Sequence, residues 1–141
     1  MSSFSFPDIN VWLALAAPEH VHAREAACWW EAETDAIGFT RFTQLGFLRL
    51  VTTAALMDGK PLTLSGAWRV YDRFYEDDRV AFVPEPREAE GLFRQRTSGR
   101  AASPKVWADA WLLAVAEAAG GTLVTFDRAL RGRGARCLLQ G

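Results

Sequence analysis

The chain has 141 residues, half of them hydrophobic and 12% aromatic, and a formal net charge of -1. This length suits one domain with a hydrophobic core, and the aromatic content argues against a disordered chain. The charge balance excludes nucleic-acid binding driven by bulk charge but leaves local basic patches open. No apolar run approaches the length of a membrane span.

The N-terminal residues and the cysteines indicate a cytoplasmic protein. The stretch Met-Ser-Ser-Phe-Ser-Phe-Pro-Asp has no basic region before its short apolar segment, so we expect no signal peptide. Cys28 and Cys137 have neither metal-ligand spacing nor the pattern of a disulfide framework. We expect both to be buried free thiols in a reducing compartment.

The chain begins with an alternating stretch over residues 3–8, which predicts a strand whose exit is marked by Pro7. Residues 10–17 have the composition of a helix, which Pro18 ends. Asp8 therefore lies between the end of a strand and the start of a helix, where an aspartate is commonly the helix N-cap.

A second helix is predicted over residues 20–33. His20 and His22 are two positions apart and do not share a helix face, which disfavours a metal site there. A short strand is predicted over residues 36–39.

The next helix is strongly amphipathic and is capped by either Thr40 or Thr43. It reaches Val51 and is expected to place Leu45 inside. Residues 56–64 then read as a connection, because Asp58-Gly59-Lys60-Pro61 are typical turn residues.

The middle of the chain continues to alternate between helix and strand patterns. A helix is predicted over residues 65–75, and an acidic, solvated turn follows at 76–78. A clear short strand is predicted over 80–83 and a helix over 85–95. The following stretch holds the first local basic cluster: Arg94, Arg96, Arg100 and Lys105.

The most informative helix is predicted over residues 105–119, opened by Pro104 and closed by Gly120-Gly121. Apolar side chains occur on nearly every face, so we expect it to be largely buried. Asp109 lies within it, and a carboxylate on an apolar stripe is costly unless it is paired, hydrogen-bonded or bound to a cation.

The C-terminal part begins with the strongest strand pattern, over residues 122–126, which ends at Asp127. A short helical turn at 128–131 and a last strand in the tail up to Leu139 follow. Strands that alternate with helices predict an α/β sandwich around a mostly parallel sheet, folded as one domain over residues 1–141.

Three aspartates fall where such a sheet gathers its functional groups. Asp8 and Asp127 follow strand ends, and Asp109 lies in the first half of the helix before the last of those strands. Carboxylates brought together repel one another unless a cation holds them, and Mg²⁺ or Mn²⁺ suits all-oxygen ligands. Such an ion activates water for attack on a phosphodiester. The sequence has no P-loop, dinucleotide fingerprint or Ser/His/Asp arrangement that competes for this role.

Four stretches in this order resemble the motifs of the PIN domain family, most closely VapC-type toxins of type II toxin–antitoxin (VapBC) systems. They are Pro7-Asp-Ile-Asn-Val-Trp-Leu-Ala-Leu15, Thr43-Gln-Leu-Gly-Phe-Leu-Arg-Leu50, Asp109-Ala-Trp-Leu112 and Thr125-Phe-Asp-Arg-Ala-Leu130. The resemblance extends over nearly the whole chain. It implies a PIN-like α/β/α sandwich, a Mg²⁺-dependent endoribonuclease acting on transfer or ribosomal RNA, a cognate VapB-type antitoxin and frequent homodimers.

The resemblance also implies a set of site residues. Asp8 matches the family's first metal-binding acid, Asp109 the acid of the central helix, and Asp127 the last acid. The family commonly has a glutamate where this chain has Gln44. Because an amide is neutral and a weaker ligand, the site is expected to be less anionic than in relatives.

Several other residues are candidates for supporting roles. Asn10 is expected to position a water or phosphate, or to cap its helix. The hydroxyl of Thr125 faces the same side as Asp127 and either hydrogen-bonds a carboxylate or water, or packs in the strand. Lys105 either contacts RNA phosphate or pairs with Asp109, and Arg128 is a further RNA contact. The candidate dimer interface comprises Trp29, Trp30 and Phe47.

Two other classes of function stay open at this point. One is a PIN-like module that binds RNA or a protein partner with weak or no catalysis, which Gln44 favours. The other is a phosphoacceptor domain of receiver type, which needs an acidic pair near the first strand. This chain has only Asp8 there.

Overall fold

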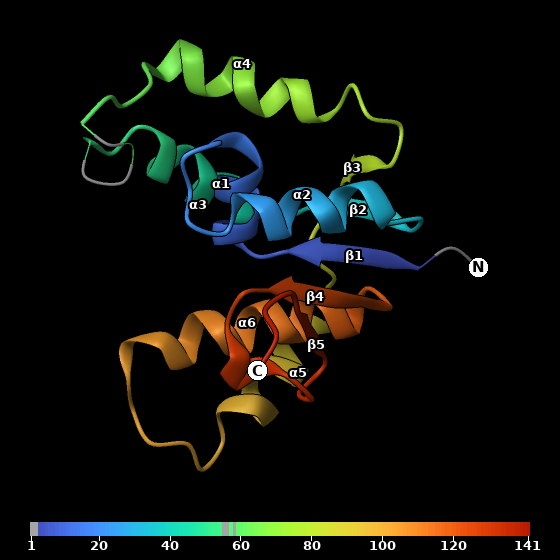
Figure 1. The fold of residues 1–141 in the computed structure, drawn as a ribbon. Helices are drawn as coiled ribbons and strands as arrows, with labels where there is room; N and C mark the ends of the chain where they lie inside the picture. The colour runs from blue at the N-terminus through green and yellow to red at the C-terminus, as the bar shows by residue number, and fades with distance from the viewer. Residues whose placement is uncertain (1–2, 55–56, 58) are drawn as a thin grey trace.

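The computed structural model describes residues 3–54, 57 and 59–141, in which a five-stranded sheet carries helices on both faces (Figure 1). The strands are β1 (Phe4–Pro7), β2 (Ala36–Phe39), β3 (Val80–Phe82), β4 (Gly121–Thr125) and β5 (Ala135–Cys137). They are ordered β3-β2-β1-β4-β5, and every pairing is parallel. The predicted α/β architecture is confirmed, with β1 at the centre of the sheet.

The helices form two layers. They are α1 (Ile9–Ala16), α2 (Ala23–Ala32), α3 (Arg41–Val51), α4 (Leu64–Phe74), α5 (Ala89–Thr97) and α6 (Pro104–Ala118), with a 3-10 turn, η2 (Arg128–Leu130). Figure 1 shows α1 to α4 in the upper part of the view, around β1 to β3, and α5 and α6 in the lower part, beside β4 and β5. Among the described residues, no helix has the length and apolarity needed to cross a membrane.

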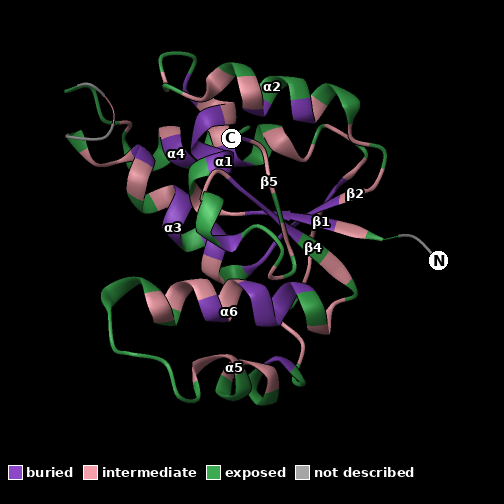
Figure 2. Cartoon of the chain, turned by 60° about the horizontal axis from the view of Figure 1, so that its bottom comes forward, coloured by how far each residue is buried: buried purple, intermediate pink, exposed green. Residues whose placement is uncertain are grey.

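The larger core lies between the sheet and helices α1 to α4. Trp12 stacks on Phe39 at a centroid distance of 3.7 Å, and the buried Phe47 meets Phe39 edge-on. A smaller core joins α6 to the other face through Phe6, Leu113 and Leu123. Figure 2 shows the buried residues gathered on the strands and on the helix sides that face them.

The cap of α3 combines both residues that the sequence offered. Thr40 is the N-cap, and its hydroxyl accepts a hydrogen bond from the backbone N–H of Thr43. The hydroxyl of Thr43 in turn accepts from the backbone N–H of Thr40 at 3.0 Å. This reciprocal capping box fixes the start of α3 beside the end of β2.

Two helices begin later than predicted. The helix predicted over 85–95 is α5 and starts at Ala89, because Pro84 and Pro86 hold the residues before them in extended conformations. The helix predicted over 20–33 is α2 and starts at Ala23, so the two histidines precede it. The connection predicted over 56–64 includes residues 56 and 58, which lie outside the described residues.

Three expectations about burial were wrong. Helix α6 is not buried on all sides, since Trp107 is 60% exposed. Leu45 is 64% exposed, because it lies on the outer side of α3. Cys28 is an exposed thiol on α2, while Cys137 is partly buried.

Two of the three residues of the candidate dimer interface are buried in the core of the chain, whereas Trp30 is partly exposed. Trp29 and Phe47 retain 3% and 0% of their surface within a single chain, so they cannot anchor a second one. The side chains of Trp29 and Phe47 are packed in the core of the chain itself, where the Trp29 ring contacts that of Trp30.

Candidate functional site

The site is built where the central strand pair ends. Strands β1 and β4 run parallel in a register that pairs Pro7 with Val124, and the backbone N–H of Asp8 donates to the Val124 carbonyl at 2.9 Å. The next side chains on each strand, Asp8 and Thr125, therefore lie side by side although 117 positions separate them. Asp127 follows two residues after Thr125.

Thr125 links the two strand-end aspartates. The residue is completely buried, and its hydroxyl donates a hydrogen bond to Oδ2 of Asp8. The hydroxyl oxygen of Thr125 also accepts a hydrogen bond from the backbone N–H of Asp127 at 3.0 Å. Of the two roles open from the sequence, the structure has the hydrogen bond to a carboxylate. One hydroxyl thus sets the position of both acids.

Both strand-end aspartates are also N-caps. Oδ1 of Asp8 accepts from the Val11 backbone N–H at 3.1 Å, and Oδ1 of Asp127 accepts from the Ala129 N–H at 2.9 Å. The interpretation of Asp8 as a helix N-cap is confirmed, but capping leaves the second carboxylate oxygen able to bind another group. Capping uses one oxygen of each acid, and the second oxygen of each faces another group of the site.

Lys105, in the first turn of α6, supplies a positive charge. Its Nζ lies 2.7 Å from Oδ2 of Asp127. The predicted pairing with Asp109 was wrong, because the lysine reaches out to the β4–η2 junction instead of along its own helix. This hydrogen bond is the main reason that the pKa of Asp127 lies below its ordinary value and that of Lys105 above it.

Asp109 faces the same place from the next turn of α6. It lines a hollow of about 210 Å³ together with Lys105 and Asp127. Desolvation raises the pKa of the Asp109 carboxyl, and the charge of Asp127 adds to this rise. The positive charges of Lys105, Arg133 and Arg100 oppose it.

Asp8 is the acid most strongly enclosed by protein. Desolvation raises its pKa above the ordinary value, and the charge of Asp109 adds a smaller rise. Hydrogen bonds from Thr125 and from the backbone N–H groups of Val11 and Asn10 act in the opposite direction. The mutual effects of the three acids show that they lie within electrostatic reach of one another.

The remaining candidates are placed less directly. Gln44 is buried near the start of α3, and its side-chain oxygen accepts from Nη1 of Arg41. Asn10 is exposed in the first turn of α1 and contributes its backbone N–H to Asp8. The guanidinium of Arg128 donates to the Gln140 carbonyl at 3.1 and 3.2 Å.

The two histidines are used structurally. Nδ1 of His20 accepts from the backbone N–H of His22 at 3.0 Å, and both rings pack on Phe126.

The donor set suits a hard divalent cation in its chemistry, because it consists of carboxylate oxygens. As the side chains stand, the described residues contain no group of three His, Cys, Asp or Glu placed to hold an ion jointly. The ammonium of Lys105 is the positive charge bonded to the acids. The carboxylates therefore fit a cation site in which the Lys105 ammonium is also bound to one of them, that of Asp127.

Arg100 and Arg133 are among the arginines that the sequence offers as candidates for an RNA track around the site, whereas Ser103 was not a candidate. Arg133 lines the hollow from the turn after η2, and Ser103 lines it from the residue before α6. The signal for Arg133 was present as Gly132-Arg133-Gly134, a pattern typical of a tight turn.

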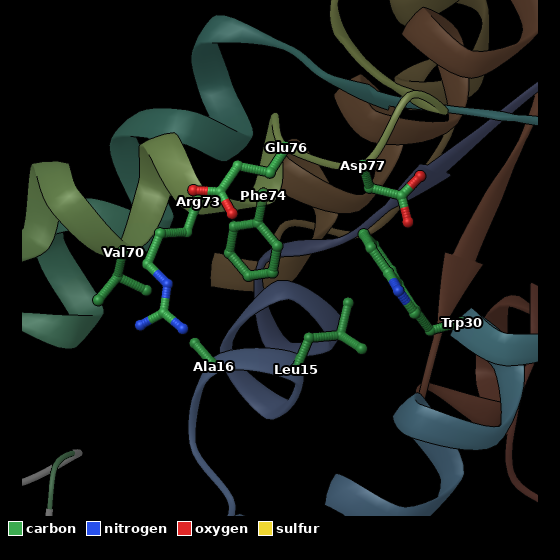
Figure 3. Close-up of a pocket in the computed structure, with 8 residues that line it drawn as sticks. All are labelled: Leu15, Ala16, Trp30, Val70, Arg73, Phe74, Glu76 and Asp77. Atoms are coloured by element: carbon green, nitrogen blue, oxygen red, sulfur yellow. The ribbon is translucent and has the colours of Figure 1, made fainter.

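A second, larger hollow of about 520 Å³ lies between α1, α2 and α4 (Figure 3). Trp30, Leu15 and Phe74 form its apolar part, and Asp77 stands at its rim. Asp77 binds Arg79 just before β3 begins, which places this hollow toward the amino edge of the sheet. It contains none of the three predicted acids.

The chain is similar to known proteins in sequence and in fold. Residues 5–134 match the PIN domain family. Ribonuclease VapC41 of Mycobacterium tuberculosis, in two strains, is 39% identical over 128 residues, which cover 86% of this chain and 88% of the relative.

Two solved structures have a similar fold. One is the M. tuberculosis toxin VapC20, described as cleaving the sarcin–ricin loop (TM-score 0.65, 14% identity, covering 94% of this chain and 96% of that one). The other is a toxin–antitoxin complex from Klebsiella pneumoniae (TM-score 0.63, 15% identity, 97% and 99% covered). At these identities the two structures show the fold alone.

Proposed function

The chain belongs to the PIN domain family, among its VapC-type ribonucleases, and from this premise we propose that it is the endoribonuclease toxin of a type II toxin–antitoxin pair. It hydrolyses RNA phosphodiester bonds and depends on a divalent ion, Mg²⁺ or, as a substitute, Mn²⁺. The observation that carries the proposal is the Asp8–Thr125–Asp127 linkage, with Asp109 facing it across the hollow.

Asp8, Asp109 and Asp127 are the proposed catalytic and metal-binding residues. A bound divalent ion supplies polarisation of a phosphoryl oxygen and a water of lowered pKa. The chain's own groups do the rest. Thr125 holds Asp8 and Asp127 in place, and the Asp8 and Asp127 carboxylates each keep an oxygen that is not used for capping.

The proposed RNA contacts are Lys105 and Arg128. Lys105 is the better supported, because its ammonium already lies at the carboxylates, where a phosphate would also be held. Arg128 contacts the Gln140 carbonyl and would reach RNA only from the outer edge of the site. Asn10 and Gln44 are proposed as supporting residues that shape the approach to Asp8.

The proposed partners are a VapB-type antitoxin, an RNA substrate and a second copy of the chain. Support comes from the relative named a ribonuclease and from the similar structure in a toxin–antitoxin complex. Ribosomal RNA and transfer RNA are the two candidate classes of substrate. The proposed compartment is the cytoplasm.

The test is cleavage of RNA by the purified full-length chain with Mg²⁺. We expect Asp8→Asn and Asp109→Asn to reduce cleavage by about a thousandfold or more, because each removes a charged ligand at the reacting phosphate. Asp72→Asn, on the exposed side of α4, is the matched control and is expected to cleave normally. Full cleavage by both site variants would overturn the assignment, and loss of cleavage in EDTA is required.

A second candidate is a PIN-like module that binds RNA or a partner without efficient catalysis. It is favoured by Gln44, which is neutral and bound to Arg41 rather than to an acid. Calorimetry with Mg²⁺ and Mn²⁺ separates the two. Intact RNA binding without any metal binding would favour the binding module over the enzyme.

A further inference from the structure

We propose that the hollow beside Asp109 and Asp127 is a subsite for a second RNA phosphate, one that neighbours the phosphate to be cleaved, and that Arg100 and Arg133 bind it. The identity of the ligand as RNA rests on the proposed function. The subsite itself rests on the charges and loops described next.

The hollow carries more positive than negative groups. Its walls include Arg100, Lys105 and Arg133 against the two carboxylates of Asp109 and Asp127. Lys105 is already bonded to Asp127. Neither arginine forms an ion pair with a carboxylate anywhere in the described residues, so both are available to an anion.

A fixed turn presents Arg133. The glycines on either side have φ of 80° and 97°, a region that side chains other than glycine rarely adopt. The Arg133 carbonyl accepts from Nη1 of Arg96 at 3.2 Å, and Nη2 of Arg96 binds Glu117 of α6 at 2.8 Å. The turn is thereby tied to the helix that carries Asp109, and the arginine is built into the rim.

Arg100 comes from the opposite rim, in the loop between α5 and α6. Its backbone N–H donates to the Thr97 carbonyl at 3.2 Å, which keeps the loop close to the end of α5. Ser103 lines the same hollow, and its hydroxyl does not cap α6 although it stands at the N-cap position. Arg100, Arg133 and Ser103 thus line one small volume from separate segments.

The chemistry of the walls selects a phosphate. The other wall residues are Val106, Ala110, Ala129 and Leu130. No aromatic ring lines the hollow, so a base has nothing on which to stack. Guanidinium groups bind phosphate oxygens in pairs, and such contacts carry no sequence information. The subsite therefore strengthens binding of any RNA strand without selecting its sequence.

The test measures binding of labelled single-stranded RNAs of different sequence to the full chain in EDTA by fluorescence anisotropy over a range of salt concentrations. We expect Arg100→Gln and Arg133→Gln each to raise Kd about tenfold for every sequence and to lower the salt slope by about 1. Arg69→Gln is the control, since it removes the same charge from exposed α4 on the other face. Circular dichroism verifies that each variant is folded.

Each result separates the subsite from the proposed activity. If the wild type cleaves RNA while both arginine variants bind it normally, the subsite is wrong and the ribonuclease assignment stands. If the variants lose RNA affinity but the wild type never cleaves, the subsite stands and the ribonuclease assignment falls. Sequence-dependent losses would overturn the phosphate assignment. Binding of inorganic pyrophosphate as tight as that of RNA would overturn the assignment of the subsite to an RNA strand.

Discussion

At the scale of single residues, Thr125 is the group on which the two strand-end aspartates depend. Its buried hydroxyl is donor to Asp8 and acceptor from Asp127 at once. A buried carboxylate that loses a donor keeps its desolvation cost without compensation. The position therefore tolerates a hydroxyl and rejects an apolar side chain of the same shape.

Replacing Thr125 by Val tests this dependence. We expect the variant to lose about 1–3 kcal/mol of unfolding free energy, because Asp8 is left without its donor. We also expect cleavage to fall at least about tenfold, because both acids lose their positioning contact. Thr125→Ser restores the hydroxyl and should recover most of both. Chemical denaturation and initial cleavage rates measure the two effects, and a Val variant equal to the wild type would contradict the role.

The pKa of Asp8 gives a pH-dependent prediction. Desolvation raises this pKa above its ordinary value of 3.8, so folding disfavours the ionised form. The contribution of Asp8 to the free energy of unfolding therefore falls as the pH rises from 3.8 through the folded-state pKa. Asp8→Asn, which can still cap α1, should be more stable than the wild type at neutral pH by about 1–3 kcal/mol.

The stability difference should nearly vanish below about pH 3, where the wild-type carboxyl is protonated in both states. Thermal unfolding in EDTA at several pH values measures it. Asp72→Asn is the matched control and should show no such pH dependence. A variant that melts below the wild type at neutral pH would refute the argument.

Lys105 yields a third prediction at this scale. Its ion pair with Asp127 is exposed, with 71% of the lysine side chain accessible, so Lys105→Gln should change stability by less than about 0.5 kcal/mol. The ammonium competes with other cations for the carboxylates, so Mn²⁺ affinity should rise about fivefold. Calorimetric titration with Mn²⁺ measures the affinity of Lys105→Gln, with Lys60→Gln as the control variant. Weaker Mn²⁺ binding by Lys105→Gln would contradict the prediction.

At the scale of elements, the β1–β4 ladder carries the site. Its first pair brings Gly121 so close to β1 that an added Cβ would lie 2.4 Å from the Phe4 carbonyl oxygen and 2.8 Å from the Phe6 ring. Moving the Phe4 carbonyl would break the pairing of the two strands, and moving the Phe6 ring would disturb the smaller core. Glycine is therefore required for these two strands to pair at their normal spacing.

Gly121→Ala should accordingly cost about 2 kcal/mol or more and reduce cleavage through loosened pairing of β1 and β4. Gly91→Ala is the control, because nothing lies within 4 Å of a Cβ at that position in α5. There, alanine should stabilise the helix by about 0.5–1 kcal/mol. Denaturant midpoints distinguish the two, and equal effects at both positions would contradict the steric argument.

The elements were largely predictable because their signals are local. Alternation, proline stops and threonine caps lie within a few residues of the structure that they determine, as the capping box of Thr40 and Thr43 illustrates. The start of α5 was misplaced because Pro86 was read as a first-turn proline, whereas the helix begins three residues later. Between Glu85 and Glu88 the sequence has no clear hydrophobic pattern that would have indicated a later start of the helix.

At the scale of the whole molecule, the packing of layers decided what local patterns could not. The exposure of Trp107 depends on α5 covering only part of α6. The partner of Lys105 depends on where the β4–η2 junction lies relative to that helix. Asp8 and Asp127 were predicted because parallel strands end at one edge of a sheet, which is a rule of topology, and Asp109 was predicted because it lies on an apolar helix. The arginine walls of the hollow follow no such rule.

The position of β4 between β1 and β5 has a consequence for the order in which the protein becomes active. Asp8 leaves the ribosome early, but its partner Thr125 lies 117 residues later. Since synthesis proceeds at about 5–20 residues per second, the central strand waits seconds for its neighbour. Until then no complete site exists. A complete site therefore forms only after Thr125 has been synthesised.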